Sequence, residues 1–412
     1  MMLSTAPDPK PTAPRRTLNI ILGVYLATAI AVAIQRTVLS RENNFWIFRA
    51  AFDHLRSGAD LYAAYPELHT DFFKYSPTFA FLFAPFALLP PTVGYALWAG
   101  VCALIVWLGV TRLLPPRPAA WALGLAWLAV LGDLQRAQSN ALVAGLMIIA
   151  WAAFERNRHL GAATAIAAGA FVKIFPLAAA AGAFLHKRWF KFGLILAAVM
   201  AVGAAIPILL AAPGSLGEQY ASWYRIETAD TAPEARYGIG GADLYAGLMG
   251  QFRVWLGVDW PHWPVQFAGL VILLLPLALQ RRRFSEALFR VQFLASVLLF
   301  CVLFNHQAES PSYVIAMLGV AIWFAASERA RWRTALLVAC IVIVNLASTD
   351  LMPREWYREY YVPFLLKTIP LIPVWIAMQL EMHGLIRNRG ESEIAEMDEA
   401  YVGRAEALPN GG

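Results

Sequence analysis

Long apolar stretches alternate with short polar segments along almost the whole chain of 412 residues. An α-helix needs about 20 apolar residues to cross roughly 30 Å of hydrocarbon, and stretches of that length recur. The pattern therefore predicts an all-α polytopic membrane protein with roughly 10–12 membrane segments. The expected conventional spans are 17–35, 92–113, 192–212, 264–280, 286–304, 310–327, 332–348 and 363–380.

Three stretches depart from the length of a simple span. Residues 76–90 are apolar but short and rich in proline, which predicts a half-buried element. Two apolar segments, each shorter than a full span, flank the polar run 132–140. The stretch 159–187 is too short for two spans, so it predicts a re-entrant or broken hairpin that turns near Lys173 and Pro176.

Basic clusters separate the apolar stretches and give each loop a side. Cytoplasmic loops of membrane proteins carry an excess of Lys and Arg, so we place all the clusters in the cytoplasm, together with both termini. The clusters are Arg15–Arg16, Arg112/Arg117, 155–159, 186–191, Arg281–Arg283, 328–333 and Arg387–Arg389. This predicts a disordered lead at 1–16, a membrane domain at 17–382 with larger external loops at 36–75 and 213–262, and an acidic, disordered cytoplasmic tail at 383–412.

Composition supports the membrane assignment and excludes other classes. Hydrophobic residues make up 59% of the chain and charged residues 15%, with a mean hydropathy of +0.55. The net charge of +6 lies in clusters between apolar runs, as topology signals do, which argues against nucleic acid binding. The cysteines all fall in apolar runs without paired spacing, so neither a disulfide framework nor a cysteine metal site is predicted.

Several polar residues lie where the pattern predicts membrane depth or an external surface. Lys173 interrupts an apolar run and offers a cation to a buried phosphate, or else is paired or reaches the surface with its side chain. Arg136, Gln138 and Asn140 form a polar apex with Asp133 and Gln135, which lines a cavity or is an ordinary hydrated loop. His306 and Glu309 share the face of a helical turn, as a site or as a polar interfacial turn.

The first external loop interleaves acids, aromatics and cations. This composition suits a wall that binds a sugar phosphate, although a solvated amphipathic helix explains residues 43–57 as well. Its candidate residues are Glu42, Asn44, Asp60, Asp71, Lys74 and Tyr75.

The run NNFWIFRAAFDHLRSGADLYAAYPELHTDFFKYSPTFAFLFAPFALLPPTVGYALW, with QSNALVAGL and GAFVKIFPLAA, resembles glycosyltransferase family 87. The resemblance covers about residues 40–190 and implies a GT-C-like helix bundle. It also implies a lipid-linked sugar phosphate as donor and an acid in the first external loop as the base. At the position of that acid this sequence has Asn44, which cannot accept a proton from the acceptor. Asp71, Glu309 and Glu42 are therefore the candidate catalytic residues.

The resemblance implies a membrane glycosyltransferase, a hexosyltransferase that moves a mannose-like sugar from a polyprenyl phosphate to a lipid or glycan acceptor. It would work on the non-cytoplasmic face of a bacterial-type plasma membrane. The alternatives are a lipid or glycan transporter or flippase, and a non-catalytic protein that binds lipid-linked glycans. No cofactor is evident from the sequence, and a divalent metal requirement is open. The candidate substrate-binding residues are Asn44, Asp60, Lys74, Tyr75, Arg136, Gln138, Asn140, Lys173 and His306.

Overall fold

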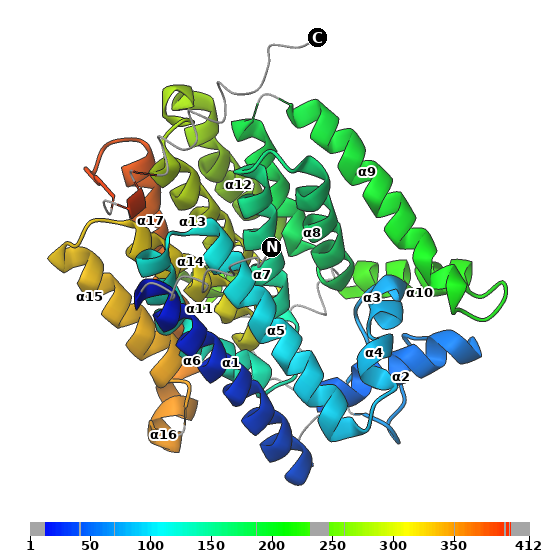
Figure 1. The fold of residues 1–412 in the computed structure, drawn as a ribbon. Helices are drawn as coiled ribbons and strands as arrows, with labels where there is room; N and C mark the ends of the chain where they lie inside the picture. The colour runs from blue at the N-terminus through cyan, green and yellow to red at the C-terminus, as the bar shows by residue number, and fades with distance from the viewer. Residues whose placement is uncertain are drawn as a thin grey trace, which may run out of the picture.

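The computed structural model describes residues 13–40, 43–69, 71–186, 188–230, 247–258, 260–349, 351–390, 393–394 and 396. These described residues form helices and connecting turns without a β-strand, so the predicted all-α fold is confirmed (Figure 1). The first half contains α1 (Ala13–Val38), α2 (Asn43–Ser57), α3 (Pro77–Leu82), α4 (Ala84–Ala87), α5 (Pro91–Leu113), α6 (Pro116–Leu134), α7 (Asn140–Phe154), α8 (His159–Val172), η1 (Phe175–Leu185), α9 (Trp189–Ala205) and η2 (Ile206–Leu209). The second half contains α10 (Leu216–Asp230), α11 (Leu248–Leu256), α12 (His262–Leu279), η4 (Arg281–Arg283), α13 (Ala287–Leu303), η5 (Ser310–Ser312), α14 (Tyr313–Ala326), α15 (Arg331–Cys340), η6 (Ile341–Leu346), α16 (Arg354–Trp356), η7 (Tyr357–Tyr361), η8 (Leu366–Thr368) and α17 (Leu371–Met382).

The apolar helices fall into two groups by length. In the described part of the chain, α1, α5, the continuous α9–η2 and α12 are long and apolar enough to cross a membrane. The segments Arg354–Tyr361 and Leu366–Met382 form one further bent pair, with 79° between them. The shorter apolar helices are α7, α8, η1, α13 and the continuous η5–α14. The chain is thus a polytopic membrane protein whose long helices surround shorter ones.

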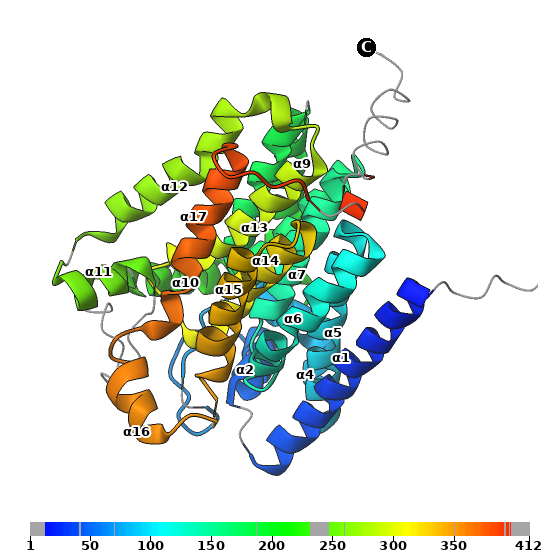
Figure 2. The same cartoon turned by 90° about the vertical axis from the view of Figure 1, so that its left-hand side faces the viewer.

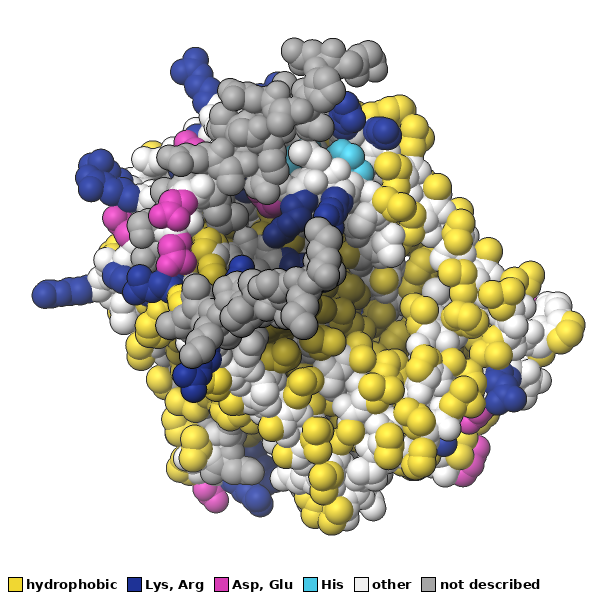
Figure 3. All heavy atoms as spheres, in the orientation of Figure 1, with side chains coloured by type: hydrophobic (Ala, Val, Ile, Leu, Met, Phe, Trp, Pro, Cys, Tyr) yellow, Lys and Arg dark blue, Asp and Glu magenta, His cyan; other side chains and the backbone are white. Residues whose placement is uncertain are grey.

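The core lies around α13 and α14, which pack against each other and against α6, α7 and α17. Every residue of α14 is buried, whereas α9 on the flank buries only Phe192 and Gly203. A helix that is apolar all round belongs inside a bundle, and one that exposes its apolar face suits contact with lipid. Figure 3 shows apolar side chains covering much of the visible flank.

Glycines let α5 and α7 approach closely. A Cβ atom at Gly145 would lie 2.9 Å from the backbone of Val106, and one at Gly109 would lie 2.9 Å from the carbonyl oxygen of Gly145. Small residues at a helix crossing replace the hydrophobic driving force that is absent in lipid. The crossing fixes α7 against the first half of the bundle.

The predicted break in 159–187 is present. α8 ends at Val172, Lys173 has an extended backbone, and η1 runs back along α8 and α7. Gly169 makes room for this return, because a Cβ atom there would lie 2.6 Å from Cγ of Pro176. Residues 76–90 likewise form the short helices α3 and α4 rather than a span.

The basic clusters gather at one end of the bundle. The Arg156 guanidinium donates to the carbonyl of Arg112, and Arg290 pairs with Glu155 at 2.8 Å. The Trp107 indole donates to the carbonyl of Leu18, which brings the start of α1 to the same end. In Figure 3 the dark-blue side chains lie mainly over the upper part of the molecule. The structure therefore agrees with the prediction that the basic clusters lie on one common side.

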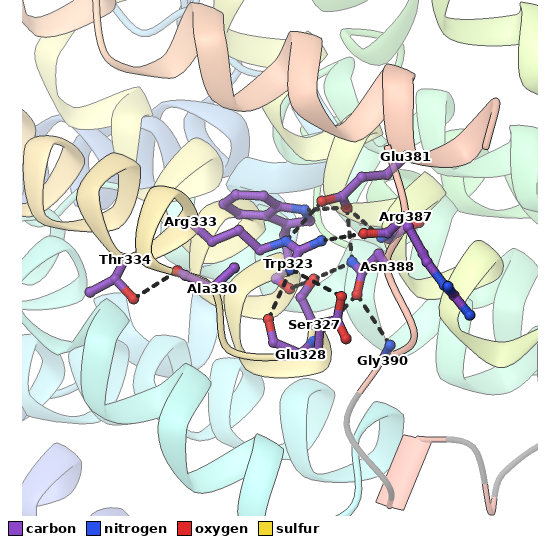
Figure 4. A network of polar contacts seen from close by, with 11 residues as sticks. Trp323, Ser327, Glu328, Ala330, Arg333, Thr334, Glu381, Arg387, Asn388 and Gly390 are labelled. Atoms are coloured by element: carbon purple, nitrogen blue, oxygen red, sulfur yellow. Dashed lines mark hydrogen bonds and ion pairs between the residues drawn. The ribbon is translucent and has the colours of Figure 1, made fainter. Parts of the chain in front are cut away.

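A buried polar network holds α13, α14, α15 and α17 together at this basic end (Figure 4). Glu381 is its centre and is 1% exposed. It accepts from Arg333 Nε at 2.9 Å, Gln292 Nε2 at 2.6 Å, Trp323 Nε1 at 2.9 Å and Asn388 Nδ2 at 2.9 Å. The buried guanidinium thus has a full counter-charge, as a buried ion needs.

Both ends of the membrane domain differ in detail from the expected boundaries. α1 begins at Ala13, so residues 13–16 belong to the helix rather than to the lead. Beyond Met382, Glu393 pairs with Arg117 at 3.8 Å, and Ile394 is buried. The first part of the acidic tail therefore packs on the bundle, and residues 1–12 and 397–412 lie outside the described residues.

We expect Glu381→Ala to lower the free energy of unfolding by about 3–5 kcal/mol, because it removes the buried carboxylate at 2.9 Å from Arg333 and leaves only the more exposed Glu328 at 3.8 Å. Glu393→Ala is the matched control, since its partner Arg117 has a side chain that is 76% exposed. It should change stability by less than about 1 kcal/mol. Thermal and denaturant unfolding in detergent measures both, and equal losses in the two variants would contradict the assignment.

Candidate functional site

The site lies at the end of the bundle opposite the basic clusters. Figures 1 and 2 both place α2, α4 and α16 at this end, which is the lower one in each view. The loop between α6 and α7, the break after α8, the segment before η5 and the helix η8 meet there through the contacts described below. Segments far apart in the sequence therefore contribute to one polar region.

Asp133 and Asn140 organise the turn between α6 and α7. The Asp133 carboxylate is 1% exposed and accepts from Asn140 Nδ2 at 3.1 Å and from the Ala141 backbone N–H at 2.9 Å. It thereby satisfies a free N–H group at the start of α7. Asn140 in turn accepts from Lys173 Nζ through its side-chain oxygen at 2.8 Å. The turn and the α8 break are thus joined by one hydrogen-bonded chain.

Lys173 is the centre of this chain. Its ammonium lies 5.9 Å from the ring centroid of Tyr75 and interacts electrostatically with Asp133, Glu309 and Lys74. Two carboxylates therefore balance a cation at membrane depth, where an unpaired charge would be expensive. The structure thus places Lys74, Tyr75, Asn140, Lys173 and Glu309 in one region.

The three candidate bases differ in their surroundings. Glu309 is exposed and interacts electrostatically with Lys173 and Tyr75. Asp71 is also exposed, but its carboxylate accepts from the Phe72 backbone N–H at 2.7 Å. Asp133 is buried with both oxygens engaged, which suits a structural role. Glu42 lies outside the described residues. The exposure of Glu309 and its interaction with Lys173 therefore favour it as the candidate base.

The side chain of Asn44 makes a contact that positions α2. Its side-chain Nδ2 donates to the Arg136 carbonyl at 2.7 Å, and this joins α2 to the turn between α6 and α7. An ionised aspartate has no donor and would place negative charge against the carbonyl. The amide at position 44 thus has a physical reason that the sequence comparison could not show.

Asp60 fastens the first loop to α10. Its carboxylate accepts from the Tyr62 N–H at 3.1 Å and from Ser222 Oγ at 3.4 Å. Burial, with help from Tyr220 and Asp60, raises the pKa of Tyr62, so its phenol stays protonated and donates to the Tyr75 carbonyl at 2.8 Å. Asp60 and Tyr62 thereby hold the backbone that presents Lys74 and Tyr75.

Two other predicted residues lie around this centre. The side-chain oxygen of Gln138 is buried and accepts no hydrogen bond from the described residues. It is an acceptor that a ligand hydroxyl can use. His306 lies against α12, where its Nδ1 is 3.3 Å from Gln266 Nε2 and its ring is 5.0 Å from that of His262.

Lys367 is a site residue that the sequence reasoning missed. It is 9% exposed, and its Nζ donates to Oγ of Ser310 at 2.7 Å and to the Ser310 carbonyl at 3.1 Å. Lys367 thus contacts the residue that follows Glu309 in the chain. The signal in the sequence is a lone lysine at the edge of the expected span 363–380. The pattern predicts only the end of an external loop at this position.

A metal site has no support in the described residues, because no group of three His, Cys, Asp or Glu side chains is arranged to hold an ion there. A metal requirement accordingly stays open.

The comparisons with known proteins name a family. The model of glycosyltransferase family 87 matches residues 72–305, more than half of the chain. The crystal structure of the Archaeoglobus fulgidus oligosaccharyltransferase in the apo form is similar with a TM-score of 0.41 and 12% identity, over 86% of this chain and 56% of that one. The chain thus spans little more than half the length of that structure. A comparison with curated proteins finds no match.

We expect Asn44→Asp to lower the free energy of unfolding by about 1–3 kcal/mol, because a carboxylate would oppose the Arg136 carbonyl. Gln35→Glu makes the same change from amide to acid at an exposed position near this end and should stay within about 0.5 kcal/mol of the wild type. Thermal unfolding in detergent compares them. An Asn44→Asp protein as stable as the control would show that the contact does not hold α2.

Proposed function

The chain belongs to glycosyltransferase family 87, and we propose that this membrane glycosyltransferase moves a mannose-like hexose from a polyprenyl-phosphate-linked donor to a lipid or glycan acceptor. We place the reaction at the end of the bundle that carries Lys173 and Glu309. With the basic clusters in the cytoplasm, this end faces outward from a bacterial-type plasma membrane.

The observation that carries the proposal is an exposed carboxylate, Glu309, that interacts electrostatically with a half-buried cation, Lys173, at one end of an apolar bundle. Glu309 is the proposed base. It takes the proton of the acceptor hydroxyl while the acceptor oxygen forms a bond to the anomeric carbon of the sugar. The bond from that carbon to the phosphate oxygen breaks, and polyprenyl phosphate leaves with the bonding pair.

The surrounding residues support this chemistry. Lys74 and Arg136 raise the positive potential where charge develops on the leaving phosphate. Asn140 fixes the direction of the Lys173 ammonium, and Asp133 fixes Asn140. The buried oxygen of Gln138 is suited to accept a hydrogen bond from a sugar hydroxyl. A flippase or a non-catalytic glycan-binding protein would have no need of a base at Glu309, so a transfer assay separates the transferase from both alternatives.

We expect Glu309→Gln to lower kcat for hexose transfer by about 10²–10⁴-fold, because an amide cannot accept the acceptor proton. Purified protein with polyprenyl-phosphate hexoses and membrane-lipid acceptors provides the assay. Glu359→Gln removes an exposed carboxylate from η7 at the same end and should leave kcat unchanged.

Asp71→Asn tests the other described candidate. Loss of transfer in Asp71→Asn with retention in Glu309→Gln would make Asp71 the base. Retention in both variants would exclude both residues and leave Glu42. No transfer by the wild type with any polyprenyl-phosphate sugar would overturn the proposed function.

A further inference from the structure

A hollow opens at the basic end of the bundle, at the turn between α14 and α15. Its volume is about 350 Å³, and it is lined by Arg329, Ala330, Arg331 and Thr334. Figure 4 shows Thr334 and Ala330 at the edge of the buried network, apart from its centre Glu381. The hollow is thus separate from the candidate site for sugar transfer, which lies at the opposite end of the bundle.

Two guanidinium groups give the hollow its positive charge. The third arginine of this turn, Arg333, is paired with Glu381 at 2.9 Å and lies 3.8 Å from Glu328. The side chain of Arg331 is exposed and makes no hydrogen bond or ion pair with the described residues. The start of α15 has no side-chain cap, so its N–H groups add to the attraction of an anion.

Aromatic rings fix the other guanidinium and indicate its depth in the membrane. The guanidinium carbon of Arg329 lies 4.4 Å from the ring centroid of Phe324 and 5.1 Å from that of Trp121. Stacking holds the plane of the guanidinium, whose N–H groups match the oxygens of a phosphate. Trp121 and Trp332 are 55% and 38% exposed, and exposed tryptophans gather at the level of lipid headgroups. The hollow therefore lies where a phospholipid has its phosphate.

An exposed face of α15 continues from the hollow along the apolar flank. Arg331, Thr334, Val338 and Val342 are all exposed and recur at intervals of three or four residues, which places them on one side of the helix. A rise of roughly 1.5 Å per residue puts Val342 about 12 Å beyond Thr334, within the roughly 15 Å of hydrocarbon in one leaflet. An acyl chain can lie along this face while its headgroup occupies the hollow.

We propose that the hollow binds the headgroup of an anionic phospholipid from the leaflet at the basic end. Arg329 and Arg331 hold the phosphate, and α15 carries an acyl chain along Val338 and Val342. The occupant is a lipid and not a free anion, because the charged hollow and the apolar face are continuous. With the basic clusters in the cytoplasm, this leaflet is the one whose anionic lipids attract basic side chains. The inference does not depend on the transfer reaction.

The test is equilibrium binding of phosphatidylglycerol to the full-length protein in detergent, followed for each bound lipid by native mass spectrometry. We expect the double variant Arg329→Gln/Arg331→Gln to weaken binding of the first lipid at least about tenfold, because it removes both charged partners of the headgroup. Arg281→Gln/Arg282→Gln is the matched control. It removes two exposed guanidinium groups from η4 at the same end and should bind like the wild type.

Two further probes test the chemistry of the occupant. Phosphatidylcholine has no net charge, so it should bind the wild type at least about tenfold more weakly than phosphatidylglycerol. Equal binding of the two lipids would overturn the recognition of charge. Glycerol phosphate carries the anion without the acyl chains, and it should not compete. Competition by it at the concentrations at which the lipid binds would overturn the assignment to a lipid.

The variants decide whether the lipid binds at this hollow. Wild-type affinity in Arg329→Gln/Arg331→Gln would overturn the site. An equal loss in Arg281→Gln/Arg282→Gln would overturn it as well, because binding would then follow net charge alone. If the double variant does not fold, as its melting curve would show, Arg331→Gln decides, and wild-type affinity in that variant would refute the proposal.

Discussion

The cost of burying charge in an apolar bundle is the constraint on which this structure depends. At the basic end each buried cation has a carboxylate, as Arg333 has Glu381 and Arg290 has Glu155. At the opposite end Lys173 and Arg136 both interact electrostatically with Asp133, and Lys173 also interacts with Glu309. The ion pairs at the basic end hold helices together, whereas the charges at the opposite end lie around the exposed carboxylate of Glu309. The same cost of buried charge therefore accounts for structural ion pairs at one end of the bundle and for the polar site at the other.

The cost of unsatisfied polar groups at membrane depth also determines where the backbone can be irregular. Groups at membrane depth can leave a helix only where other protein groups satisfy the freed N–H and C=O groups. The break after Val172 frees Lys173 to reach Asn140, and the break before η8 places Lys367 against Ser310. Lys173 and Lys367 therefore lie beside helix breaks and not in the middle of continuous helices. Glycine at position 169 and the contacts of α11 make the two breaks sterically and electrostatically tolerable.

Much of the fold could be predicted because it follows from local sequence. Apolar length set the spans, prolines marked the short elements at 76–90, and the position of Lys173 before Pro176 marked the hairpin. The site was only partly predictable, because its decisive contacts join distant segments. Asn44 meets the carbonyl of a residue 92 positions away, and Lys367 meets Ser310 across 57 positions. No periodicity reports such pairings, and Lys367 was accordingly missed.

The contact of Asn44 explains why an amide stands at position 44 and why the proposed base comes from another segment. The amide at position 44 donates to the turn that carries Arg136, and an acid there would weaken that attachment. A base must then come from another segment, and Glu309 reaches the same region from the loop before η5. The match to family 87 ends at residue 305, so Glu309, Ser310 and Lys367 all belong to the unmatched part of the chain. The first half supplies Lys173 and Arg136, and the second half supplies Glu309, the proposed base. The reaction would then need both halves docked, which the buried network around Glu381 secures from the other end of the bundle.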